Sequence, residues 1–204
     1  MPLRSVVSTA LTSLLDLGFG RAAHGLAELT PHPVQLDVPR VAIQSVDNVC
    51  DSLGPISEIA VASVHQRFSG PIAGDALLIL GQSRAAILKE LLTDEPALPL
   101  SIDASAREIL TEIGNIVLNA CLGTFTGLLQ RPVRSSVPQI SLVTVDRILE
   151  TLRVSGGEAQ YAIVVHAAFK LRDAEVPGFL VIALSVASLD RVLRAVEDWE
   201  QRSR

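Results

Sequence analysis

The sequence matches itself at a nearly constant shift along its length. Asp16 and Asn115 lie 99 residues apart, and Pro39 and Pro138 are separated by the same 99 residues. Phe68 matches Phe169 with a slightly larger shift. A shift that persists through a helical stretch, a proline and an apolar strand indicates that one structural unit occurs twice. We therefore expect two similar halves related by a pseudo-two-fold axis.

Hydrophobic periodicity and turn residues predict the same order of elements in each half. The first half is expected to have a helix over 8–28, a strand over 34–38 closed by Pro39, strands over 58–68 and 76–80, and a helix over 83–92 capped by Ser83. The second half is expected to have a helix over 105–129, strands over 133–137, 141–145, 161–171 and 179–184, and a helix over 188–202. Turns are expected at Pro71–Gly74, at Pro177–Gly178 and at the GGE sequence of 156–158.

These elements predict an α/β fold in which two pseudo-symmetric repeats share one mainly antiparallel sheet, with helices packed on it. Repeat one is expected over about 5–92 and repeat two over about 101–204, within a single domain of residues 1–204. Between them, the polar and proline-containing stretch 93–100 is typical of a linker. The alternative is a pair of independently folded domains joined at this linker.

Composition excludes several classes of function. The 17 basic and 22 acidic residues give a net charge of −5, and the sequence has no basic run, so nucleic-acid binding is not expected. Hydrophobic residues make up 49% and aromatic residues 3%, which predicts a globular protein with an aliphatic core. The uncharged run over 113–130 contains two Asn, two Thr, a Gln and three Gly, so membrane insertion is not expected either.

The cysteines and histidines predict neither disulfides nor a metal site. Cys50 and Cys121 stand in apolar surroundings without a CxxC motif, which favours buried thiols in the reducing cytoplasm. The four histidines form no pair with ligand spacing, so no metal site of the protein's own is expected.

The helix over 105–129 carries the candidate functional residues. Its apolar residues recur three and four positions apart, whereas Glu108, Glu112, Asn115 and Asn119 share the opposite face. An acidic acceptor and an amide one turn apart, Glu112 and Asn115, therefore point the same way. Gly114 lies between them, where a missing side chain is expected to let a partner's backbone come close. The simplest alternative is that this polar face is only the solvated side of an amphipathic helix.

The spacing Glu112-x2-Asn115, followed after twenty-two residues by Pro138, resembles the signature of the CheC family of chemotaxis phosphatases and the Glu-Asn pair of the related CheX proteins. The EIGN and SVP strings around these residues fit the resemblance, although the family pattern has Asp or Ser where this chain has Glu108. The resemblance implies an α/β fold of two repeats over essentially the whole chain. It also implies two copies of the site, and in the first half the matching positions hold Ser13 and Asp16, a degenerate pair.

The family hydrolyses the phospho-aspartate of CheY-type response regulators, whose own pocket holds Mg²⁺, so the resemblance implies that this protein has no metal or other cofactor of its own. The resemblance thus implies that Asn115 orients the attacking water and that Glu112 pairs with a cationic side chain of the regulator. Glu108 and Gly114 are then expected to contact the partner. Because ionised Asp16 cannot donate a hydrogen bond, only the second site is expected to be complete.

Two alternatives of other classes remain. One is a docking module without turnover, which binds a phosphorylated regulator or a CheD-type deamidase. The other is a relative of the flagellar switch components FliY and FliM, which share this fold. We expect neither the additional C-terminal domain nor the N-terminal regulator-binding peptide of that group in this chain.

Overall fold

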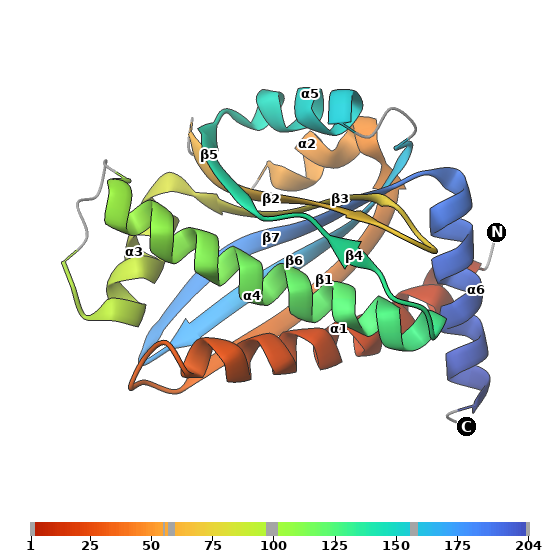
Figure 1. Ribbon diagram of the computed structural model, residues 1–204, viewed down its shortest axis with the longest axis horizontal. Coiled ribbons are helices and arrows are strands. Elements are labelled where there is room, and N and C mark those ends of the chain that lie inside the picture. Colours follow the sequence, from red (N-terminus) through yellow and green to blue (C-terminus); the bar gives the residue numbers. More distant parts are fainter. Residues whose placement is uncertain (1–2, 55, 57–59, 97–101, 156–158, 203–204) are drawn as a thin grey trace.

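The computed structural model describes residues 3–54, 56, 60–96, 102–155 and 159–202. In this part of the chain, one seven-stranded sheet carries six α-helices (Figure 1). Helices α1 (Leu3–Ala27) and α4 (Ala104–Leu129) lie side by side on one face, and α2 (Val49–Leu53) and α5 (Val145–Ser155) lie on the other (Figure 1). Helices α3 (Gln82–Thr93) and α6 (Val186–Arg202) lie at opposite ends (Figure 1).

The strands of the two halves are interleaved in the sheet. The order is β1 (Val34–Ser45), β6 (Tyr161–Leu171), β7 (Ala174–Leu184), β3 (Gly74–Gly81) and β2 (Val61–Ser69), and β2 also pairs with β4 (Arg134–Ser135) and β5 (Gln139–Val143). All of these pairings are antiparallel. Strand β1 of the first half thus pairs with the β6–β7 hairpin of the second half, and β5 of the second half pairs with the β2–β3 hairpin of the first. The two hairpins are joined by the pairing of β3 with β7. The predicted α/β fold with a shared antiparallel sheet is confirmed.

The domain boundaries stay a prediction. The linker expected over 93–100 is described only as far as residue 96, where α3 has already ended. Because β1 depends on β6, and β5 on β2, neither half completes its own sheet, which favours a single folding unit over two separate domains.

The main core lies between the sheet and the pair α1–α4. It is built from aliphatic side chains that alternate along the strands, together with Phe19 and Phe125, which are both fully buried. Each such side chain contributes about 1.5–3 kcal/mol on transfer from water. The two helices approach closely because α1 presents glycine, and a Cβ at Gly18 would lie 3.2 Å from the backbone Cα of Cys121.

A smaller core on the other face holds two short helices that sequence reasoning missed. Ile148 and Leu152 of α5 are buried against strands β6 and β7, together with Val49 and Leu53 of α2. The four-residue spacing in each pair is the available signal, but five and eleven residues give few turns over which to recognise a period.

Two proline predictions are wrong for the same physical reason. Pro39 does not close a strand: β1 continues through it, with a register shift between Asp37 and Arg40 on an edge of the sheet. Pro177 does not form a turn either, because β7 pairs with β3 only over Phe179–Leu184 and leaves the proline beside a single neighbour. Proline is tolerated where no ladder hydrogen bond is required. The turn falls instead at Arg172, whose φ is 53°.

Other boundaries differ by a few residues. Gly81 is the N-cap residue of α3, so Ser83 lies inside the helix and does not cap it. The strand expected over 133–137 is only two residues long, and β5 begins two residues earlier than expected. The turn expected at 156–158 lies outside the described residues.

Candidate active site on helix α4

Helix α4 separates its apolar and polar residues as the spacing predicts. Asp103 caps its N-terminus, where Oδ1 accepts a hydrogen bond of 2.8 Å from the backbone N–H of Ala106. Ile113 and Val117 are fully buried, whereas Glu108 and Glu112 are exposed. By length and composition α4 is the one helix among the described residues that could cross a membrane, but half of its most apolar window is buried, so this is weak evidence.

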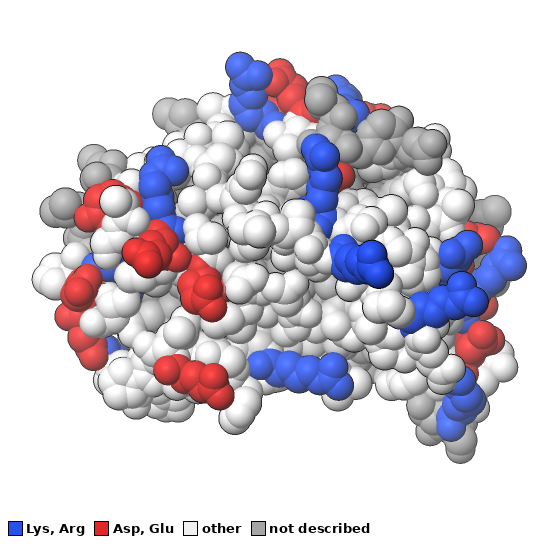
Figure 2. All heavy atoms as spheres, viewed as in Figure 1, with Lys and Arg blue, Asp and Glu red and all other residues white. Residues whose placement is uncertain are grey.

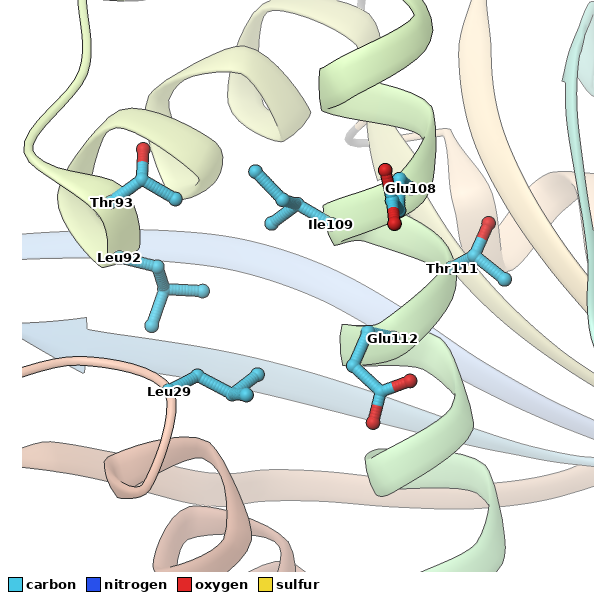
Figure 3. Close-up of a pocket in the computed structure, with 7 residues that line it drawn as sticks. All are labelled: Leu29, Leu92, Thr93, Glu108, Ile109, Thr111 and Glu112. Carbon is cyan, nitrogen blue, oxygen red and sulfur yellow. The ribbon is translucent and has the colours of Figure 1, made fainter.

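Glu108 and Glu112 line a pocket of about 520 Å³ (Figure 3). Its other walls are Leu29 after α1, Leu92 and Thr93 of α3, and Ile109 and Thr111 of α4. The carboxylates thus stand beside an apolar floor. Figure 2 shows acidic side chains gathered toward this end of the α1–α4 face and basic side chains toward α6. The pocket is suited to a cationic side chain with an aliphatic stem.

Asn115 is half-buried one turn after Glu112 on α4, and its side-chain amide accepts a hydrogen bond from a neighbouring amide. Nδ2 of Asn119 donates to Oδ1 of Asn115 at 2.6 Å. Nε2 of Gln66, on β2, lies 3.3 Å from Oδ1 of Asn119 and donates at 2.7 Å to the backbone oxygen of Ser136. A chain of amides thus connects Asn115 to the sheet and to the segment that leads into Pro138.

Sequence reasoning missed these roles of Asn119 and Gln66. The sequence places Asn119 on the polar face of this helix and assigns it no role in the site, although its four-residue distance from Asn115 is a usable signal for a contact between the two side chains. Gln66 gives one weak signal: it is a polar residue at an inward-facing position between the buried residues Val64 and Phe68. Nothing local in the sequence connects it with a helix that begins 38 residues later.

The partner-contact prediction for Gly114 is wrong. Gly114 is buried, and a Cβ there would lie 2.6 Å from the Cβ of Val64 in β2. The missing side chain therefore lets α4 approach the protein's own sheet. Gly114 is four residues from Leu110 and from Leu118, both buried, so the helical period places it on the inner face.

The matching place on α1 has different chemistry. Ser13 and Asp16 are exposed, as expected for a pair on the helix surface. Partial burial, and secondly the neighbouring charge of Asp37, raise the pKa of Asp16. Asp37 accepts a hydrogen bond of 2.5 Å from Lys170, and this bond is the main cause that lowers its pKa. The first-half position thus lies beside an ion pair, and its own carboxylate is repelled there.

Neither cysteine is in an environment that favours a nucleophilic thiolate. Burial raises the pKa of both thiols, and Cys121 is fully buried. Raised thiol pKa values disfavour the nucleophilic thiolate. Across the described ranges, no group of three or more His, Cys, Asp or Glu side chains is arranged to hold a metal ion.

The sequence and the fold are similar to those of several known proteins. The sequence is 27% identical over 154 residues to the CheY-P phosphatase CheC of Bacillus subtilis, a match that covers 74% of this chain and 73% of CheC. The structure is similar to that of FliY from Thermotoga maritima, with a TM-score of 0.78 at 15% identity over 97% of this chain and 99% of the other. It is also similar to the FliM middle domain from H. pylori, with a TM-score of 0.67 at 10% identity over 94% and 98% of the two chains. No family model matches the sequence.

The shared sheet, the doubled order of elements and a pair of helices on one face define a CheC-like fold. Together with the 27% identity to CheC, this fold supports the predicted resemblance to the CheC/CheX family.

Proposed function

We propose that this protein is a phosphatase that hydrolyses the phospho-aspartate of a CheY-type response regulator, in the cytoplasm, in chemotaxis or a related two-component pathway. The observation that carries the proposal is the Glu112–Asn115 pair on the polar face of α4, in a chain similar to a CheY-P phosphatase. The site in the first half, at Ser13 and Asp16, is proposed to be inactive.

In the proposed reaction, the oxygen of a water molecule bonds to phosphorus. The bond from phosphorus to the aspartate carboxylate breaks, that carboxylate leaves with the bonding electrons, and the proton of the water ends on phosphate. Little covalent chemistry is required of the protein, so positioning of the water is the main contribution. Asn115 is proposed to orient this water, because a neutral amide can both accept from it and donate to phosphoryl oxygens. A carboxylate in its place would be repelled by the phosphoryl group.

Glu112 is proposed to pair with a cationic side chain beside the regulator's phosphorylation site. The pocket next to Glu112 supports this role, since Leu29 and Ile109 offer apolar surface to an aliphatic stem while the carboxylates face the charge. Glu108 lines the same pocket and is proposed to contribute to docking. Mg²⁺ is proposed to stay with the regulator.

The proposal is tested by the decay of a phosphorylated CheY-type regulator with and without this protein. Faster decay with wild type and loss of the acceleration in Asn115→Ala is the expected result. The exposed Asn48, which makes no side-chain capping hydrogen bond at α2, supplies the matched control Asn48→Ala, which should behave as wild type. An active Asn115→Ala variant with normal thermal stability would exclude Asn115 as the catalytic residue.

A non-catalytic docking module is the second candidate, which the fold shared with FliY and the FliM middle domain leaves open. The partner in that case is the phosphorylated regulator or a CheD-type deamidase. Binding of either protein without any change in the decay of the phospho-regulator would support this function over hydrolysis.

A further inference from the structure

We propose that Asn119 and Gln66 are positioning residues for Asn115, which fix the orientation of its amide before the regulator binds. The inference rests on the proposed hydrolysis and adds two residues to it. Neither residue belongs to the Glu-x2-Asn pair, and Gln66 comes from β2 in the other half of the chain.

The hydrogen bonds define which end of the Asn115 amide is held. Oδ1 of Asn115 accepts the 2.6 Å bond from Asn119, so one of its two lone pairs is occupied. Among the described residues no other group is hydrogen-bonded to this amide, so the other lone pair and both Nδ2 hydrogens remain for a water and a phosphoryl oxygen. Without this bond the amide could turn over and exchange its donor and acceptor ends. The bond therefore selects one of two orientations.

Gln66 donates a hydrogen bond to Asn119 from the sheet side of the helix. Its side chain is 2% exposed and bridges Oδ1 of Asn119 and the backbone oxygen of Ser136 through Nε2. Ser136 is tied to β2 by its own N–H, which donates to the oxygen of Arg67 at 2.8 Å. The amide chain is thus anchored on the sheet rather than on mobile surface side chains.

The side-chain oxygen of Gln66 indicates that a glutamine is not the most stabilising residue for this position. Its Oε1 is buried and accepts no hydrogen bond from the described residues. An unsatisfied buried acceptor costs free energy, which an apolar side chain of similar size would not. A purely structural position between Val64 and Phe68 favours such an apolar residue, so the glutamine is explained better by its donor group.

The matching position on α1 has no counterpart of either residue. His65 and Phe68 match His166 and Phe169 at a shift of 101, which aligns Gln66 with Ala167. The shift of 99 that relates Asn115 to Asp16 aligns Asn119 with Gly20. Neither alanine nor glycine has a side chain that forms hydrogen bonds. Counterparts of both positioning residues are therefore absent at the α1 position, where the Glu-Asn pair is also absent.

The test measures kcat and KM on a phosphorylated CheY-type regulator for Asn119→Ala, Asn119→Asp and Gln66→Leu. Each variant is expected to lower kcat by about tenfold with KM unchanged, because a misplaced group costs rate rather than binding. Gln66→Leu should keep or raise the melting temperature while kcat falls, a split that a structural role would not give. For Asn119→Asp, the ratio to wild-type kcat should rise as the pH falls from 7 toward 5, since a protonated carboxyl can again donate to Asn115. The ratio for Asn119→Ala should stay flat.

A second readout needs no regulator. The side-chain amide of Asn115, assigned by its loss in Asn115→Ala, should be rigid by ¹⁵N relaxation in wild type and mobile in Asn119→Ala. An Asn119→Ala variant with wild-type kcat, or with an equally rigid Asn115 amide, overturns the inference and leaves the proposed function standing. A wild-type protein that does not accelerate decay overturns the proposed function and this inference with it, even where the amide is rigid.

Discussion

Helices α1 and α4 occupy matching places in the two halves, yet they differ at each position that concerns the candidate site. Where α4 has Glu112 and Asn115, α1 has Ser13 and Asp16. At the residues that build the sheet, by contrast, Phe68 and its counterpart in the other half are both buried aromatics. The two halves thus share a buried aromatic at this position of the sheet and differ in the polar pair of the candidate site, where core packing does not dictate the residue type.

The two helices also meet the sheet differently. Gly114 brings the backbone of α4 against Val64, whereas the matching residue of α1 is Leu15, a fully buried side chain. A leucine keeps two backbones apart, and a glycine does not. The close approach of α4 to β2 places Asn119 within hydrogen-bonding distance of Gln66. The comparison thus suggests that the glycine serves the site indirectly, through the distance between helix and sheet.

The largest expected difference between the halves is in activity. Asn115→Ala should lower kcat/KM on a phosphorylated CheY-type regulator by about 100-fold, because the attacking water would lose the amide that is proposed to orient it. Asp16→Ala, the matched change in α1, should leave kcat/KM unchanged. Phosphate release under multiple-turnover conditions measures both, and equal losses in the two variants would show that the halves are not functionally distinct.

Gly114→Ala should destabilise the protein by about 1–3 kcal/mol, because the new methyl group overlaps Val64 and the core must shift. Gly123→Ala is the matched control on the same helix, where a Cβ meets nothing within 4 Å. It should stabilise by up to about 1 kcal/mol through helix propensity. Urea unfolding compares them, and an equally stable Gly114→Ala protein would contradict the close-approach explanation.

The first half can be used to rebuild the site. In an Asn115→Ala background, Ser13→Glu with Asp16→Asn restores the pair, and Gly20→Asn adds the counterpart of Asn119 in open space. The double change should recover little activity, and the added asparagine should raise kcat by up to about tenfold, since it restricts the new amide. A double variant as active as the triple one would argue against the need for a positioning residue.

The smallest effect concerns Asp16, whose pKa is raised by burial and by Asp37. A raised pKa means that the ionised carboxylate disfavours the folded state. The free energy of unfolding therefore falls as the pH rises above 3.8, the ordinary pKa of an aspartate. Asp16→Asn should therefore stabilise the protein at pH 7, by only a few tenths of a kcal/mol for so exposed a group. The gain should fade as the pH falls through the raised pKa toward 3.8. Thermal unfolding at pH 7 and pH 3.5 checks both the sign and the window.

The sequence was sufficient for features that are periodic or local. The three-and-four spacing on α4 separated Glu112 and Asn115 from the buried residues because helix geometry repeats every 3.6 residues. The same period could have placed Gly114 on the inner face. The two prolines were misjudged because a proline's effect depends on whether a neighbouring strand needs its N–H, and the sheet order decides that.

The sequence by itself determined that the fold is doubled, that α4 has one polar face, and that only one half carries the Glu-Asn pair. The tertiary structure alone decided that the halves exchange strands β1 and β5 and that Gln66, Asn119 and Ser136 meet. The physical reason is the range of each interaction. A helical face is set by neighbours three or four residues away, whereas a contact between residues 53 or 70 positions apart exists only after sheet register and helix packing have been fixed.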